Sequence, residues 1–472
     1  MTKPFGFKDK LGYLMGDIGN DFTFVLSSTF LLKFYTDVMG VSAAVVGTIM
    51  MIARFVDAFT DVTMGRICDK SPATKAGKFR PWILRMCGPV AISSFLIYQS
   101  GLANLSMGVK ILYLFVTYIL WGSVFYTSIN IPYGSMASAI SPEPGDRQSL
   151  STYRSLGASV ATVAVGAIIP AIAYKEINGA LVLDGKTFTL IAGIFSVLAV
   201  VSYLVCYFLT TERVTGVREE ADEGESHSPK GSESRNGVIT MLRNALTNKA
   251  LISIIAASIV MLLAQMTLQS MANYVYPNYY GNTGAQSVST IIMLAGTFLA
   301  AGIAKPVSGI LGKAEVGAIA SLAAAAVSVL LFFLRPSNVW VYVALQAVCY
   351  LAIGVFSMIS WALITDVIDY SELRNGIRED GSVYALYSFA RKLGQAGAAG
   401  LSGILLSAIG YSEETAFLEP VKKGIFNIAT LVPALGFILL GLILWLWYPL
   451  HKEQVEKNVE ALKQKYHKKR KS

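Results

Sequence analysis

Runs of twenty or more mainly apolar residues recur along the whole 472-residue chain, and they restrict its possible folds more than any other feature. Only 15% of the residues are charged and the mean hydropathy is +0.54, whereas soluble domains carry about 25% charged residues. In a bilayer every backbone polar group must be bonded internally, so runs of this length form transmembrane helices. The sequence therefore predicts an all-α protein that crosses a membrane many times.

Twelve such runs are present, and a hydrophilic segment separates the first six from the last six. Their approximate spans are 11–37, 42–66, 81–104, 108–139, 149–174, 187–210, 249–276, 286–311, 314–335, 338–366, 381–410 and 424–449. We predict an N-terminal six-helix half over 1–210, a cytoplasmic linker over 211–248, a C-terminal six-helix half over 249–450 and a basic amphipathic cytoplasmic tail over 451–472. Two such halves are typical of a major-facilitator-type transporter, with the substrate site near the midplane.

The distribution of basic residues predicts the orientation of the chain in the membrane. Lys and Arg concentrate before the first span, in the 66–80 loop and in the tail, while the loops on the other side hold few. The positive-inside rule therefore places both termini in the cytoplasm of a bacterial-type inner membrane, in contact with membrane lipid. Asp17 and Asp21 interrupt the first apolar run, so we expect no cleaved signal peptide.

Several function classes are disfavoured by composition. The four cysteines are scattered, which predicts neither a disulfide nor a metal site, and all three histidines fall in loops or the tail. No Ser/His pair, metal constellation or Walker-type loop accompanies the spans, so we expect no enzyme and no cofactor besides a coupling ion. The net charge is +9, but no platform for stacking on nucleic-acid bases accompanies the basic residues, which argues against nucleic-acid binding.

Two aspartates lie inside the second predicted span. Asp57 and Asp61 share one helix face because they are four residues apart, and Arg54 lies on nearly the same side. A charge at bilayer depth costs at least about 2.5–3.5 kcal/mol, so it is rarely without a role. The pair predicts a site for sodium or a transported proton, and the alternative is a structural ion-pair cluster with Arg54.

The fourth span offers neutral oxygens beside these carboxylates. Thr127 and Asn130 share a face, Tyr126 is an aromatic candidate for stacking on a sugar, and Pro132 frees a backbone carbonyl. Thr127 and Asn130 are predicted to complete the cation shell, although polar residues of this kind also join helices.

Further charges predict a substrate site and a gate. In the first span Asp17 and Asp21 repeat the four-residue spacing, and carboxylates accept hydrogen bonds from sugar hydroxyls. Near its end Lys33 and Asp37 predict an interfacial ion pair or snorkelling. Further candidates for the substrate site are Arg154 in the fifth span and Arg391 and Lys392 in the eleventh. The candidate gate residues are Arg54, Asp69, Asp366 and Asp369.

The chain resembles the glycoside–pentoside–hexuronide:cation symporters, the melibiose-permease-like branch of the major facilitator superfamily. The resemblance covers essentially the whole chain. It is carried by Gly16-Asp17-Ile18-Gly19-Asn20-Asp21-Phe22, Tyr35-Thr36-Asp37, Ala53-Arg54-Phe55-Val56-Asp57-Ala58-Phe59-Thr60-Asp61, Gly77-Lys78-Phe79-Arg80-Pro81-Trp82, Asn130-Ile131-Pro132-Tyr133 and Asp366-Val367-Ile368-Asp369-Tyr370. Together these blocks are highly specific.

The resemblance implies that Asp57 and Asp61 bind the coupling cation, with Thr127 as a cation-site hydroxyl. It implies sugar contacts at Asp21 and Arg154, and a link between the halves at Lys392. In the melibiose permeases an aspartate stands at the position of Asn130 and a tryptophan at that of Gly134. These departures favour proton over sodium coupling and argue against a melibiose-like galactoside mode.

Within that family, the stretches around Asn130 and around Arg391 and Lys392 are most similar to the glucuronide carriers, and Arg391 suits a uronic-acid carboxylate. We therefore predict a secondary active symporter that couples inward proton or sodium movement to uptake of a glycoside, most plausibly a glucuronide or pentoside, and works as a monomer. The alternatives are a sodium-dependent lysolipid carrier on the same scaffold and a non-transporting membrane sugar sensor.

Overall fold

The computed structural model describes residues 4–214, 248–375 and 380–469, so most of the predicted linker lies outside the described residues. The described chain forms two compact units. Unit 1 takes in the described residues of 1–227 together with Ala272–Thr290 and Ala399–Lys422, and unit 2 takes in the described residues of 228–271 together with Ile291–Ala398 and 423–472. Four helices of the C-terminal half therefore contribute residues to both units: α9 (Lys249–Tyr274), α10 (Thr283–Leu311), α13 (Asp380–Ala408) and α14 (Glu419–Leu442).

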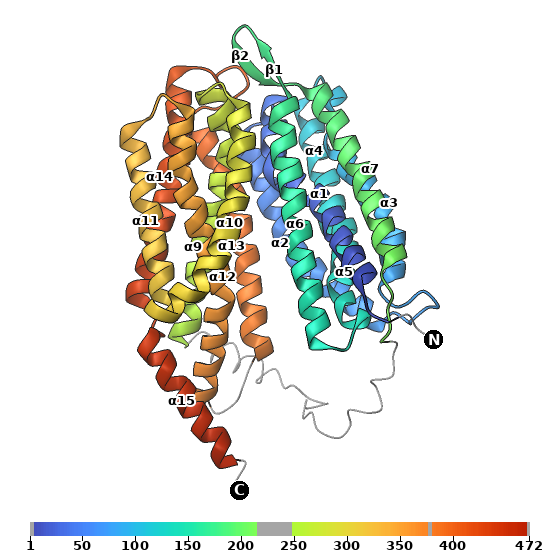
Figure 1. Cartoon of the computed structure of the whole chain (residues 1–472). Helices are drawn as coiled ribbons and strands as arrows, with labels where there is room; N and C mark the ends of the chain where they lie inside the picture. The colour runs from blue at the N-terminus through green and yellow to red at the C-terminus, as the bar shows by residue number, and fades with distance from the viewer. Residues whose placement is uncertain (1–3, 215–247, 376–379, 470–472) are drawn as a thin grey trace. The chain divides into compact units, whose positions relative to one another are not determined.

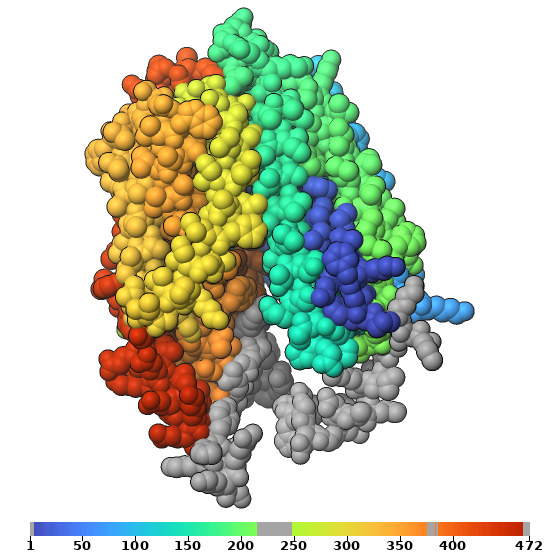
Figure 2. Space-filling model, viewed as in Figure 1, coloured from blue at the N-terminus to red at the C-terminus, as the bar shows by residue number. Residues whose placement is uncertain are grey.

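Unit 1 is built around its first helix. Its elements are α1 (Phe7–Asp37), α2 (Ala43–Lys70), α3 (Arg80–Ile97), η1 (Ser100–Leu102), α4 (Met107–Ile119), the π-helical η2 (Leu120–Tyr126), α5 (Thr127–Ile140), α6 (Pro144–Ile172), β1 (Tyr174–Ile177), β2 (Ala180–Leu183), α7 (Gly185–Leu209) and the π-helical η3 (Val275–Tyr279). Helix α1 packs on α6 and α7, and Figure 2 shows these three side by side. Because α1 is central, the consecutive residues from Phe30 to Asp37 are all buried, which covers every side of the helix.

Unit 2 is a helical bundle with an alanine-rich core. The elements of the C-terminal half are α9 (Lys249–Tyr274), α10 (Thr283–Leu311), α11 (Lys313–Leu334), α12 (Val339–Asn375), α13 (Asp380–Ala408), α14 (Glu419–Leu442), the π-helical η4 (Ile443–Trp447) and α15 (Lys452–Lys469). Small residues let α11 approach α12 closely, since a Cβ on Gly317 would lie 2.8 Å from the Ile359 side chain. The tail forms α15, which contacts α11 and α12 and pairs Lys465 with Glu372 at 3.1 Å.

Each of the twelve predicted spans overlaps one of these helices or the continuous run α4–η2–α5. Nine helices of the described chain are long and apolar enough to cross a membrane. The other predicted spans, 11–37, 81–104 and 381–410, overlap α1, α3 and α13, whose apolar sequences contain charged side chains. Helix α3 ends at Ile97, before the end of its predicted span. The prediction of an all-α membrane fold is confirmed.

A two-stranded hairpin follows α6, and the sequence analysis missed it. Strands β1 and β2 are antiparallel, with Tyr174 opposite Leu183 and Ile177 opposite Ala180. Asn178 and Gly179 form the turn with φ of 53° and 79°, the left-handed pair that Asn-Gly supplies in hairpins. The hairpin marks one end of unit 1, opposite the N-terminus (Figure 1), and we call it the hairpin end.

The opposite end of unit 1 is fixed by the residues that follow α7. Glu212 is buried, and its carboxylate accepts hydrogen bonds from the backbone N–H groups of Lys78, Phe79 and Arg80 at 2.7–2.9 Å. Those of Phe79, the N-cap residue, and Arg80 are among the unsatisfied donors at the start of α3, and that of Lys78 directly precedes them. A Cβ on Gly77 would meet this carboxylate at 2.5 Å, and Gly77 has φ of +113°. This turn therefore requires both glycine and the acid.

Replacing Glu212 by Ala is expected to lower the free energy of unfolding of unit 1 by about 2–4 kcal/mol, because three half-buried N–H donors lose a charged acceptor. The measurement is the thermal unfolding midpoint of the purified protein in detergent. Glu176→Ala on the exposed face of β1 is the matched control, and equal midpoints for the two variants would contradict the prediction.

Candidate functional site

The carboxylates of α2 face two hydroxyls of η2 and α5. Ser123 Oγ donates to Asp57 Oδ1 at 2.5 Å, and Thr127 Oγ1 donates to Asp61 Oδ1 at 2.8 Å. In each pair the two residues are 66 positions apart in sequence. Asp57 and Asp61 are therefore spaced like Ser123 and Thr127, and the two helix segments run in the same direction. We call Asp57, Asp61, Ser123 and Thr127 the carboxylate–hydroxyl row.

The π-helical segment η2 sets the geometry of this row. Thr127 Oγ1 also donates to the carbonyl of Gly122, five residues earlier, at 3.2 Å. Gly122 is buried, and a Cβ there would lie 3.4 Å from Asp57 Oδ1. Single π-helical turns inside α-helices occur frequently at functional sites. The sequence analysis predicted Thr127 but missed Ser123, although the same four-residue spacing leads from one to the other.

Arg54 lies against the row, one turn before Asp57. Its Nη1 is 3.3 Å from Asp57 Oδ2, and its guanidinium lies 4.9 Å from the Phe24 ring centre. The two acids and one guanidinium sum to a formal charge of −1, which one monovalent cation neutralises. Within the described residues, no group of three or more His, Cys, Asp or Glu side chains is placed to hold a metal ion.

Asn130 belongs to a second set of polar contacts. Its Oδ1 accepts from Asn20 Nδ2 at 3.4 Å, and Asn20 Oδ1 accepts from the Tyr203 hydroxyl at 2.9 Å. This chain connects α5, α1 and α7. Sequence reasoning did not assign Tyr203 or Asn20, because the contacts join helices that are far apart in sequence.

The predicted sugar-site charges meet between α1 and α6. Arg154 Nε donates to Asp17 Oδ1 at 3.0 Å, and the guanidinium also lies 5.4 Å from the Tyr133 ring centre. Asp17 is buried, whereas the Arg154 side chain is 42% exposed and accessible to a ligand. Asp21 lies one turn after Asp17 and interacts electrostatically with both Asp17 and Arg154.

Tyr126 completes the predicted site residues of unit 1. Its ring stacks on Phe24 with centroids 5.7 Å apart and contacts Trp121 at 5.4 Å. Because Phe24 also holds Arg54, this aromatic contact joins the carboxylate–hydroxyl row to α1.

Asp69 is exposed at the end of α2, where its backbone carbonyl accepts from Lys78 Nζ at 2.9 Å.

The remaining candidates belong to unit 2. Arg391 lies 5.8 and 5.9 Å from the ring centres of Trp361 and Tyr387, and Lys392 is half-buried beside it. Asp366 is buried, and Lys313 Nζ donates to both of its carboxylate oxygens, at 2.6 and 2.8 Å. Asp369 is half-buried on the same helix, α12.

Lys33 and Asp37 form a buried network at the hairpin end, in contrast to the interfacial pair predicted. Lys33 Nζ is 2.7 Å from Asp37 Oδ2, and the Lys33 side chain is 1% exposed. Lys33 also donates to Asn278 Oδ1 and to the Tyr411 hydroxyl, while Tyr411 donates to Asp37. The predicted ion pair is confirmed. The predicted snorkelling is wrong, because Asn278 and Tyr411, which are remote from Lys33 in sequence, cover the lysine.

Comparison with known proteins identifies the family. The family described as "MFS/sugar transport protein" matches residues 12–452. The chain belongs to this family. The glucuronide carrier protein homolog of Escherichia coli (strain K12) is 29% identical over 95% of the chain and 94% of that protein. The isoprimeverose transporter of Lactiplantibacillus pentosus is 30% identical over 97% of the chain and 91% of that protein.

A solved structure agrees at the level of the fold. The crystal structure of a D-xylose-proton symporter matches with a TM-score of 0.63 at 13% identity, over 93% of the chain and 97% of that structure. Membership of this family makes the chain a multi-pass membrane sugar transporter with the major facilitator fold, and not an enzyme. The assignment to the glycoside–pentoside–hexuronide branch is confirmed by the family match and the relatives.

Proposed function

We propose that this transporter couples the inward movement of one monovalent cation to uptake of a glycoside, with the cation at Asp57 and Asp61. The carboxylate–hydroxyl row carries the proposal. It presents two acids and two hydroxyl oxygens in register, and with Arg54 its formal charge is −1. A cation bound there would contact the carboxylates in place of the two hydroxyl donors. This change of contacts would favour one conformation of the transporter over another.

The identity of the ion follows from the composition of the row. Asn130 stands in place of a third carboxylate and is held by Asn20 at 3.4 Å, so the row carries less negative charge for a sodium ion. A proton needs only one of the two carboxylates. We therefore propose proton coupling, with sodium as the alternative.

A glucuronide is the substrate that the residues favour. The relative named as a glucuronide carrier homolog supports this class, and Arg154 offers an exposed guanidinium beside Asp17. Arg391, held against two aromatic rings, suits the carboxylate of a uronic acid. The isoprimeverose transporter favours an uncharged pentoside as the second candidate.

We further propose an inner-membrane location with both termini in the cytoplasm, on the basis of the distribution of Lys and Arg. The hairpin end would then face away from the cytoplasm. The domain limits, the monomeric state and the gating role of Arg54, Asp69, Asp366 and Asp369 stay predictions.

The test is uptake of a labelled glucuronide into proteoliposomes, with pH and sodium gradients imposed separately. Accumulation driven by the pH gradient alone is expected. Accumulation driven only by sodium would contradict proton coupling, while accumulation of isoprimeverose but no glucuronide would replace the substrate. Uptake of a labelled lysolipid together with no glycoside uptake would favour the lysolipid carrier.

A further inference from the structure

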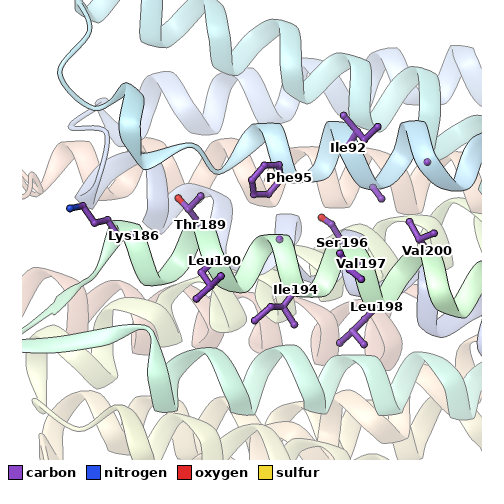
Figure 3. A pocket seen from close by; sticks show the side chains of 13 residues that line it. Ile92, Phe95, Lys186, Thr189, Leu190, Ile194, Ser196, Val197, Leu198 and Val200 are labelled. Atoms are coloured by element: carbon purple, nitrogen blue, oxygen red, sulfur yellow. The ribbon is translucent and has the colours of Figure 1, made fainter.

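A long apolar groove runs along the surface of unit 1 between α3 and α7, away from the residues discussed above. Its volume is about 930 Å³, and Gly88, Ala91, Ile92 and Phe95 of α3 face α7 residues from Lys186 to Val200 across it. Figure 3 shows Lys186 at one end of the row of side chains and Val200 at the other. Among the polar lining residues, Thr189 donates inward to the carbonyl of Tyr98 and Ser196 is buried.

Glycine residues shape the floor of the groove. A Cβ on Gly193 would lie 3.3 Å from the Phe95 ring, so α3 and α7 approach closely there. By contrast, nothing lies within 4 Å of a Cβ on Gly88, which opens onto empty space. The rims are formed by strongly exposed side chains such as Leu190 and Val197, at 65% and 64%. An apolar hollow of this kind in a membrane protein must be filled by apolar groups.

The length of the groove matches one leaflet of a bilayer. Lys186 and Val200 are fourteen positions apart on α7, which corresponds to about 21 Å of helix. Half of a bilayer, with its headgroup region included, is about 20–22 Å. A lipid with its headgroup at Lys186 therefore has room for an acyl chain along the groove.

The charge at the Lys186 end favours an anion. Lys186 is exposed and lies one residue after the start of α7, where the helix dipole also favours negative charge. The nearby acid is already engaged, because Asp184 pairs with Lys175 at 2.8 Å and accepts from Thr187. Burial opposes the effect, but these hydrogen bonds hold the pKa of Asp184 below its ordinary value.

We propose that this groove is a binding site for an anionic phospholipid, with an acyl chain between α3 and α7 and the phosphate at Lys186. On the proposed orientation the lipid belongs to the leaflet that faces away from the cytoplasm. The site does not depend on which glycoside or ion the protein carries.

The test is native mass spectrometry of the full-length protein with phosphatidylglycerol and phosphatidylcholine of identical acyl chains. Lys186→Gln is expected to reduce the preference for phosphatidylglycerol about fivefold, the contribution of one lysine near an anionic lipid. Gly88→Phe fills the open space and is expected to reduce binding of both lipids. Lys423→Gln at an exposed site on α14 and Gly108→Phe at an exposed site on α4 are the matched controls.

Three outcomes would overturn the proposal. Lys186→Gln could leave the lipid preference equal to that of Lys423→Gln, or Gly88→Phe could bind as much lipid as Gly108→Phe. A dimer that Gly88→Phe dissociates would instead show that a second copy fills the groove. Thermal unfolding midpoints of all four variants establish that each is folded.

Discussion

Asp57→Asn is expected to lower gradient-driven glycoside uptake about 10- to 150-fold, the effect of losing one charged hydrogen-bond partner worth roughly 1.5–3 kcal/mol. The amide keeps the size of the side chain, and its oxygen still accepts from Ser123. The charge is lost, however, so Arg54 and Asp61 then sum to zero and the row no longer attracts a cation. Exchange of glycoside across the membrane without a gradient is expected to persist.

The measurement compares proteoliposome accumulation under a pH gradient with equilibrium exchange for the same preparation. Glu414→Gln, an exposed acid outside the row, is the matched control and should accumulate substrate like the unmodified protein. Full accumulation by Asp57→Asn would refute the cation assignment. Equal loss of exchange and accumulation would show instead that Asp57 supports substrate binding or folding.

Lys33→Met is expected to destabilise unit 1 by about 3–5 kcal/mol, because it leaves Asp37 buried without its cation. Asp37 is 7% exposed, and its remaining hydrogen bonds from Thr36 and Tyr411 do not supply a compensating charge. Replacing both members of the pair, in Lys33→Met/Asp37→Asn, is expected to recover most of the loss. The measurement is the thermal unfolding midpoint of each variant in detergent.

Lys422→Met provides the comparison for this prediction. Lys422 pairs with Glu419 at 2.9 Å, but Glu419 is 69% exposed, and pairs of that kind contribute about 0–1 kcal/mol. If Lys33→Met and Lys422→Met unfolded at the same temperature, the buried pair would have no special role. A double variant less stable than Lys33→Met would likewise contradict the argument.

The helices follow from the sequence because a bilayer leaves few alternatives for long apolar runs. The hairpin was missed because Tyr174 and the residues before it read as the end of an apolar span, although Asn178-Gly179 is a strong turn signal. Glu212 was missed for a different reason. It lies in a hydrophilic stretch that resembles a linker, and its partners are more than 130 positions away.

The candidate site was predictable where spacing within one helix decides the geometry. Asp57 and Asp61 lie on one face of α2, as the four-residue spacing and the apolar background indicated. Contacts between helices could not be derived in this way, so the pairing of Arg154 with Asp17 was not predicted. The burial of Lys33 likewise depends on Asn278 and Tyr411, which no local pattern connects to it.

The π-helical turn of η2 has a consequence for how this transporter can change in length during evolution. A π-helical turn holds one residue more than the α-helical turn it replaces, so a deletion between Leu120 and Gly122 would rotate Ser123 and Thr127 together away from α2. An insertion between α3 and α4 would leave both hydroxyls facing the same carboxylates. Alignments of relatives should therefore place gaps in the α3–α4 loop, and a relative without the extra residue in η2 is expected to present a different set of oxygens to its α2 carboxylates.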